Sequence, residues 1–187
     1  MRAVTYSMST SLDGYIVGPD GMFGWSVPDP DVFAFATEEV RNVDVHLMGR
    51  RLYETMRFWE GGEDNADLDD AEREFARIWN VLPKVVFSST LSQVDPTARL
   101  ATGGLAEEIA RLQAEPGEGS IAIGGATLAA QAATLGLIDE YRVRVYPVLV
   151  GGGIPFFARD DQQVALELVE SRVFDCGVVF HRHRVVR

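Results

Sequence analysis

Three short apolar runs in this 187-residue chain end on glycine or hydroxyl residues, and each precedes a turn or a helical pattern. The runs are VDVHLMG before RRLYETMRFW, KVVFSST before GGLAEEIARLQAE, and SIAIGG before ATLAAQAATLG. Strands that alternate with helices pair in parallel, because a crossover must carry the chain back to the start of the next strand. The sequence therefore predicts an α/β protein with a mostly parallel central sheet.

The ends of the chain complete this sheet. Residues 3–9 alternate as a strand, a glycine-rich loop fills 11–25, and a helix follows with Asp29 or Asp31 as its N-cap. The last third holds three strand-like runs, EYRVRVYPVLV, VALELVESRVF and GVVFHRHRVVR, separated by GGGIPFFARDDQQ and by the turn DCG. We expect these runs to add antiparallel strands, and residues 1–187 to form a single domain.

Charge and composition exclude several classes of binding partner. The net charge is −11, with a pI near 4.7, so the overall field repels nucleic acid and anionic membrane surfaces. No apolar run is long enough to span a bilayer, and the N-terminus lacks the pattern of a secretory signal. One cysteine, Cys176, excludes a disulfide framework and a cysteine-based zinc site. We expect a cytoplasmic protein that binds a small molecule and no metal.

The segment Gly49-Arg50-Arg51 is the first candidate anion site. Two cations in the first turn of a helix oppose the macrodipole, at about 0.3–1 kcal/mol each. A bound phosphate would resolve this conflict, because it takes hydrogen bonds from free N–H groups and from both guanidinium groups. The alternative is that both arginines extend into water, with Glu54 as a surface ion-pair partner.

Two further strand ends are candidate phosphate sites. Gly124 and Gly125 stand where a strand meets a helix, although the third glycine of the dinucleotide fingerprint is missing. Ser88 and Ser89 follow another strand and either bind phosphate or only end the strand. In parallel sheets ligands bind at the carboxyl ends of the strands, so we expect these corners to converge into one electropositive trough.

The glycine-rich loop and the histidines offer other candidates. Asp13 either contacts a polar substrate or caps a turn, and Tyr15 and Trp25 either stack on a flat ring or belong to local core. The three histidines alternate within strand patterns without a nearby nucleophile, and we interpret them as structural: His46, His181 and His183.

Taken in order, SLDGYIVGPDG, LMGRRLYE, VVFSST, GGATL and DEYRVRVYPVLVGGGIPFF resemble the dihydrofolate reductase-like family. They are most similar to its branch with the C-terminal reductase domain of riboflavin-biosynthesis proteins. The resemblance implies a three-layer α/β fold with a mixed central sheet, NADPH as cofactor and a homodimer. It implies reduction of a small heterocycle, most similar to 5-amino-6-(5-phosphoribosylamino)uracil. The alternatives are a dihydrofolate or pterin reductase and an NADPH-binding module without turnover.

The resemblance also assigns roles to residues. It places Gly49, Arg50 and Arg51 at the adenosine phosphates, Ser88 and Ser89 near the 2′-phosphate, Gly124, Gly125, Ala126, Thr127 and Leu128 at the pyrophosphate, and Ser9 and Ile16 at the nicotinamide. The loop GPDGMFGW would close over the nicotinamide, with Trp25 at its hinge. Asp13 and Asp31 are the candidates for catalytic contact with the substrate.

Two departures from the family pattern bear on the substrate. Folate reductases carry a buried carboxylate on the first helix. Counting by the family's spacing puts that position at Phe33 or Pro30 here, neither of which is a carboxylate, and Asp31 is next to Pro30. In riboflavin reductases a basic residue commonly follows SLDG, whereas this chain has Tyr15.

Overall fold

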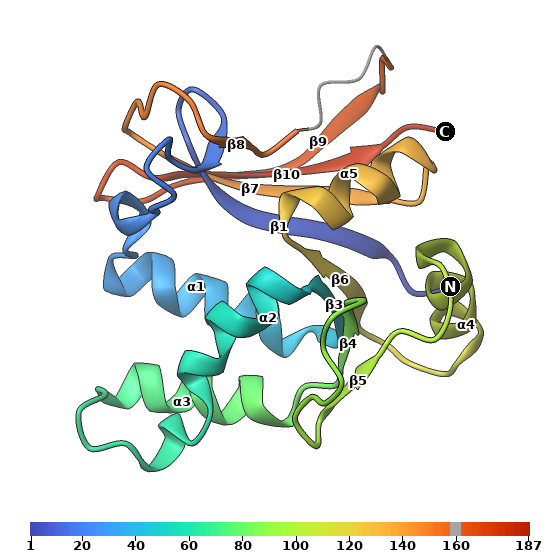
Figure 1. Ribbon diagram of the computed structural model, residues 1–187. Helices are drawn as coiled ribbons and strands as arrows, with labels where there is room; N and C mark the ends of the chain where they lie inside the picture. The colour runs from blue at the N-terminus through green and yellow to red at the C-terminus, as the bar shows by residue number, and fades with distance from the viewer. Residues whose placement is uncertain (158–161) are drawn as a thin grey trace.

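The computed structural model describes residues 1–157 and 162–187, so the end of the predicted GGGIPFFARDDQQ connection lies partly outside the described residues. Within them, one sheet of eight strands forms the centre of the molecule (Figure 1). Including a separate pair, the described residues form ten strands: β1 (Val4–Ser11), β2 (Tyr15–Val17), β3 (Val43–Gly49), β4 (Lys84–Phe87), β5 (Ala98–Leu100), β6 (Ser120–Gly124), β7 (Glu140–Tyr146), β8 (Ile154–Pro155), β9 (Leu166–Val173) and β10 (Val179–Val185). Their order in the large sheet is β5-β4-β3-β6-β1-β7-β10-β9, and β2 pairs with β8 separately.

The pairing confirms a mostly parallel sheet with antiparallel C-terminal strands. Every neighbouring pair from β5 to β7 is parallel, whereas β10 runs antiparallel to both β7 and β9. Strand β1 lies in the middle, with Tyr6 opposite Ile123 on β6 and Tyr141 on β7. Because the parallel strands point the same way, their carboxyl ends share one edge of the sheet.

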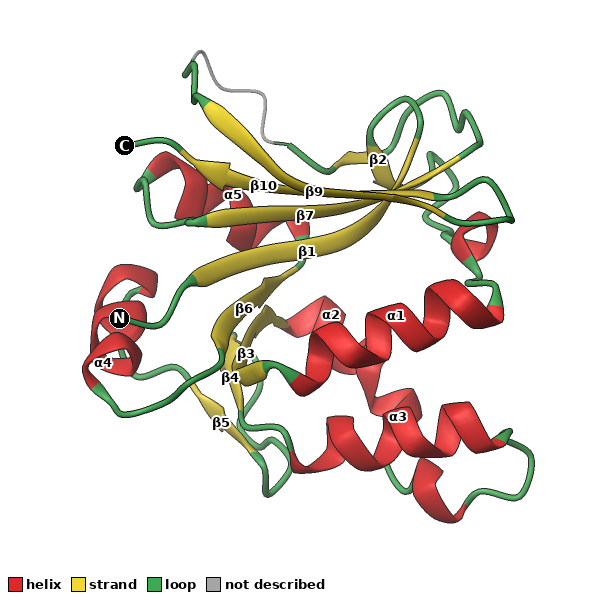
Figure 2. Cartoon of the chain, turned by 180° about the vertical axis from the view of Figure 1, so that it is seen from behind, coloured by secondary structure: helices red, strands yellow, loops and turns green. Residues whose placement is uncertain are grey.

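Helices cover both faces of the sheet and make the predicted three layers (Figure 2). They are α1 (Pro30–Arg41), α2 (Arg50–Met56), α3 (Asp70–Val81), α4 (Leu105–Ala114) and α5 (Ala126–Thr134), with short 3₁₀ helices η1 (Gly24–Ser26), η2 (Arg57–Trp59) and η3 (Gly62–Asp64). Helices α4 and α5 bury Ile109 and Ala132 against one face of the sheet. Helices α2 and α3 pack Tyr53 and Trp79 against Met48 on the other face.

Helix boundaries follow local capping. Asp29 is the N-cap of α1, because its carboxylate accepts a hydrogen bond from the Asp31 N–H at 3.2 Å. Asp69 and Glu72 form a capping box that starts α3. Among the described helices, none is long and apolar enough to cross a membrane.

Three short strands were missed by the sequence patterns. Strand β2 lies inside the segment 11–25 that we expected to be loop, so a short turn at 12–14 precedes it and a longer irregular part begins at Gly18. Strand β8, inside a glycine-rich segment, pairs with β2, and β5 adds an edge strand beside β4. Strand β7 ends at Tyr146 rather than running on through PVLV.

Candidate functional site

Three of the predicted corners lie next to one another at the carboxyl edge of the sheet. Strand β3 has β4 on one side and β6 on the other, and all three are parallel. In register, Gly49 lies opposite Phe87, and Met48 lies opposite Gly124. The loop after β4, the start of α2 and the start of α5 therefore leave the sheet at adjacent positions.

The corner between β6 and α5 is built around two glycines. Gly124 is buried, and a Cβ there would overlap the side chains of Leu52 and His46. Gly125 is the N-cap of α5 with φ +87°, a conformation that disfavours other residues. Since Gly125 has no side chain to cap the helix, the first-turn N–H groups of α5 stay available to an anion. Thr127 is exposed at the same turn.

The corner between β3 and α2 carries the two arginines. Arg50 forms an ion pair with Glu54 at 3.4 Å, and both side chains are about half exposed. The predicted surface pairing with Glu54 is therefore present. Arg51 is also exposed. A Cβ on Gly49 would meet no described atom within 4 Å, so the backbone at this corner is open to approach.

The serine corner after β4 is partly used by the chain itself. The Ser88 hydroxyl oxygen accepts hydrogen bonds from the N–H groups of Thr90 and Leu91, at 3.2 and 3.1 Å. It caps the turn that ends the strand, which was one of the two interpretations of this residue. Ser89 is exposed beside it.

The remaining residues assigned to the cofactor differ in what they can offer a ligand. Ile16 and Leu128 are buried, and their side chains belong to the hydrophobic core. A ligand could therefore reach only their backbone groups. Ser9, near the end of β1, hydrogen-bonds to Tyr146, and burial is the main reason that the pKa of this phenol is raised.

The two candidate catalytic aspartates sit in different surroundings. Asp13 is exposed, and its carboxylate accepts hydrogen bonds from the N–H groups of Val150 at 3.2 Å and Gly151 at 2.8 Å. A hydrogen bond from Ser11 is the main cause that lowers the Asp13 pKa. Asp31 lies exposed in the first turn of α1, so it is not a buried carboxylate of the folate-reductase kind.

A largely enclosed ion pair beside β1 was not predicted from the sequence. The Arg144 guanidinium donates to the Ser7 hydroxyl at 3.2 Å and also to Glu39 on α1. The side chains of Arg144 and Glu39 are each only 12% exposed. The signal was the alternation in EYRVRVY, which places Arg142 and Arg144 on one face of a central strand.

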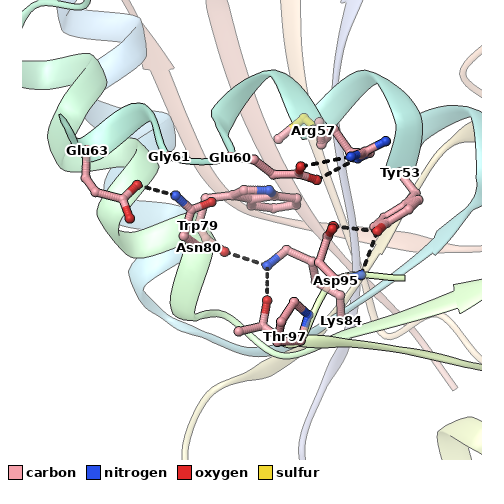
Figure 3. A pocket seen from close by; sticks show the side chains of 12 residues that line it. Tyr53, Arg57, Glu60, Gly61, Glu63, Trp79, Asn80, Lys84, Asp95 and Thr97 are labelled. Atoms are coloured by element: carbon pink, nitrogen blue, oxygen red, sulfur yellow. Dashed lines mark hydrogen bonds and ion pairs between the residues drawn. The ribbon is translucent and has the colours of Figure 1, made fainter. Parts of the chain in front are cut away.

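Two cavities lie away from this edge. One, of about 340 Å³, lies between α2, α3 and residues 95–97, with Trp79 and Lys84 in its wall (Figure 3). The other, of about 550 Å³, lies near Arg2 and Arg111. Neither lining includes Gly49–Arg51 or Gly124–Thr127, so neither cavity is the predicted trough.

The residues at the carboxyl edge fit the phosphates of a dinucleotide. The turn at Gly125 leaves the first N–H groups of a nine-residue helix uncapped, as a pyrophosphate requires. Arg50 and Arg51 supply charge one strand away, where the backbone of Gly49 is open.

Comparisons with known proteins identify the family. Residues 2–180 match the family model described as RibD C-terminal domain. The uncharacterized protein YyaP of Bacillus subtilis (strain 168) is 32% identical over 178 residues, which cover 95% of this chain and 92% of YyaP.

Solved structures share the fold. A Shewanella sp. PV-4 protein named for riboflavin biosynthesis matches with a TM-score of 0.76 and 26% identity, over 100% of both chains. A diaminohydroxyphosphoribosylaminopyrimidine deaminase/5-amino-6-(5-phosphoribosylamino)uracil reductase from Thermotoga maritima matches with a TM-score of 0.68 and 15% identity, over 99% of this chain and 57% of that one. The chain belongs to the RibD C-terminal domain family and has its dihydrofolate reductase-like fold.

Proposed function

We propose that the protein is an NADPH-dependent reductase that acts on a small heterocycle of the 5-amino-6-(5-phosphoribosylamino)uracil type. Family membership supports a reductase role. The observation that carries the proposal is the register that places Gly49, Arg50 and Arg51 beside the Gly124–Gly125 corner. This arrangement puts two cations and uncapped helix N–H groups at one edge of an acidic molecule.

The proposed cofactor contacts follow from what each corner offers. Gly125, Ala126 and Thr127 hold the pyrophosphate through backbone N–H groups, while Arg50, Arg51 and Ser89 bind the adenosine phosphates. When bound, NADPH supplies the hydride that reduces a C=N or C=O bond of the substrate.

The chain itself contributes positioning and enclosure. Ser9 on β1 lies opposite Arg144 on β7, and in this proposal their polar groups orient the substrate. Asp13 and Asp31 remain the proposed catalytic contacts. In this proposal the segment after Gly18 closes over the nicotinamide and excludes water during transfer.

We also propose that the protein acts as a homodimer through β9. This strand forms one edge of the sheet and has eight residues, of which seven are exposed. Leu168 is 55% exposed and Val173 is 74% exposed. An edge strand of this length leaves backbone N–H and C=O groups unpaired, and in this proposal a second copy pairs with them.

The test combines binding and turnover on the intact chain. Thermal unfolding is measured with NADPH and with NADH, and then the loss of reduced-nicotinamide absorbance is followed with aminouracil, pterin and folate compounds. NADPH at 100 times its dissociation constant should stabilise the fold by about 2.7 kcal/mol.

Oxidation of NADPH with an aminouracil supports the full proposal, and oxidation with a pterin or folate changes the proposed substrate. A shift without oxidation by any compound favours a binding module. No shift with either cofactor contradicts the proposal.

A further inference from the structure

The larger cavity lies at the opposite edge of the sheet from the proposed cofactor site. It has a volume of about 550 Å³, and its wall includes Val45, Val85 and Ala98, near the starts of β3, β4 and β5. The C-terminal end of α4 closes its other side with Leu112 and the residues that follow. A cavity of this size can hold a small metabolite.

The wall of this cavity is rich in cations, although the chain has a net charge of −11. Arg2, Arg99 and Arg111 line it. Two carboxylates are also in the wall, Asp44 and Glu115. Lys84 lines the cavity too, but its ammonium already donates to the carbonyls of Trp79 and Leu82, at 2.6 and 2.7 Å. Arg2 is largely buried, so the guanidinium groups of Arg99 and Arg111 are the ones that a ligand can reach.

Their hydrogen-bonding capacity exceeds the acceptors that the protein provides. Arg99 and Arg111 share one carboxylate, that of Glu108, which Arg99 contacts at 3.2 and 2.7 Å. Glu108 is only 2% exposed, whereas Arg99 and Arg111 remain 38% and 47% exposed. One buried carboxylate thus neutralises one of two guanidinium charges, and each guanidinium has five N–H donors.

Arg2 supplies a second and independent observation. Its side chain is only 7% exposed, and its terminal nitrogens contact Asp44, Glu115 and the carbonyl of Leu112. Within the described residues its Nε–H is buried and has no hydrogen-bond partner. A buried donor without an acceptor is costly, so the wall of this cavity holds a cation whose hydrogen bonding is incomplete.

We propose that this cavity is a second binding site, for a small phosphorylated molecule. Guanidinium groups bind phosphate with several parallel hydrogen bonds, and Arg99 and Arg111, which share the Glu108 carboxylate, keep N–H donors for a ligand. The alternative explanation is that cations stabilise the C-terminus of α4. That would explain why Arg2 and Arg111 lie there. It does not account for Arg99, which comes from β5.

The test uses pyrophosphate as the probe and amide NMR shifts as the readout, because pyrophosphate could also bind at the carboxyl edge. Binding in the cavity should shift the amide signals of Arg99 and Gly117, whereas binding at the other edge should shift those of Gly125 and Thr127. Shifts confined to Gly125 and Thr127 would overturn the proposal. So would shifts at Arg99 and Gly117 that need pyrophosphate far above cellular levels, because they would show an adventitious ion only.

Variants make the assignment specific. Arg111→Gln should weaken pyrophosphate binding, read at Gly117, about tenfold, which is the effect of losing one charge-assisted hydrogen bond. The matched control is Arg77→Gln, since Arg77 also follows its glutamate partner by three residues on a helix but lies outside the cavity. Equal effects of the two variants would contradict the proposal.

A third variant keeps the test possible if Arg111→Gln does not fold. Arg111→Lys keeps the charge and loses the planar donor pair, so it should bind with intermediate affinity. Binding at Gly117 that is unchanged in both folded Arg111 variants would also overturn the proposal. Arg51→Gln should leave the shifts at Gly117 unchanged, which keeps this site distinct from the proposed cofactor edge.

Discussion

The Asp13 carboxylate accepts a hydrogen bond from the Gly151 N–H at 2.8 Å, across 138 residues of sequence. A second bond, from the Val150 N–H, reaches the other carboxylate oxygen. Strands β1 and β7 are parallel neighbours, so the loops that follow them leave the sheet side by side, and Asp13 joins the two. This carboxylate therefore has a structural task, whatever it contributes to substrate binding.

Replacing Asp13 should loosen the loop after β7. In Asp13→Ala the N–H groups of Val150 and Gly151 lose their acceptors, so their amide hydrogen exchange should become faster. The control is Asp20→Ala, because Asp20 caps only a local turn through the Met22 N–H. Unchanged exchange at residues 150 and 151 in Asp13→Ala would show that the contact does not order this loop.

Gly125→Ala should destabilise the fold because Gly125 has φ +87°. An alanine in this conformation costs about 1–3 kcal/mol in the free energy of unfolding, measurable by urea denaturation. Gly104→Ala is the matched control, since Gly104 is also a helix N-cap, has φ −69°, and a Cβ there would meet no described atom within 4 Å. It should change stability by less than about 0.5 kcal/mol. Equal losses would contradict the role of the positive φ.

Arg50→Ala should weaken NADPH binding more than NADH binding, because only NADPH carries the 2′-phosphate. Loss of one charge-assisted contact predicts roughly a tenfold increase in the dissociation constant for NADPH. Arg57→Ala is a suitable control. Arg57 is an exposed arginine directly after the same helix, and like Arg50 it forms an ion pair with a glutamate, Glu60. If both cofactors lose affinity equally in Arg50→Ala, the 2′-phosphate does not lie near this residue.

His46 should make stability depend on pH under mildly acidic conditions. Burial is the main cause that lowers the pKa of His46 to about 4, with the charge of Lys84 adding to it. The unfolded chain binds a proton near pH 6.5, so the free energy of unfolding should fall as the pH drops from about 6.5 to about 4. The loss should be at most about 3 kcal/mol and should diminish in His46→Gln. An unchanged pH dependence in that variant would exclude His46 as the source.

A charge on β9 should dissociate the proposed dimer. Leu168→Lys places an ammonium on the exposed edge, and sedimentation velocity should then show a monomer. Val81→Lys is the control, because Val81 is 72% exposed at the end of α3, away from this edge. A wild-type protein that sediments as a monomer would contradict the dimer directly.

Local patterns predicted the long elements of this fold well. Runs such as SIAIGG, and the Leu105, Ile109 and Leu112 spacing of α4, contain enough apolar residues to define their period. Strand β5 has only three residues, which are too few to define a period, and its pairing depends on β4. Strands this short are stabilised by their neighbours, so a single-sequence pattern could not reveal them.

The candidate site was predictable only in part, for a related reason. Glycine at a strand end marks a sharp corner within a few residues, so Gly49 and Gly125 could be found locally. The ties between Asp13 and Gly151, and between Arg2 and Leu112, join residues more than 100 positions apart. Such contacts depend on which strands become neighbours, and the sequence alone did not determine the strand order.

The position of β3 between β4 and β6 also sets when the proposed cofactor site can form. A growing polypeptide can make the Gly49 corner early, but its partner corner exists only after residue 124 has been synthesised and β6 has inserted beside β3. Between these events the ribosome adds about 75 residues, which takes several seconds or more at about 5–20 residues per second. Nascent chains should therefore gain affinity for the proposed dinucleotide only after β6 has been synthesised.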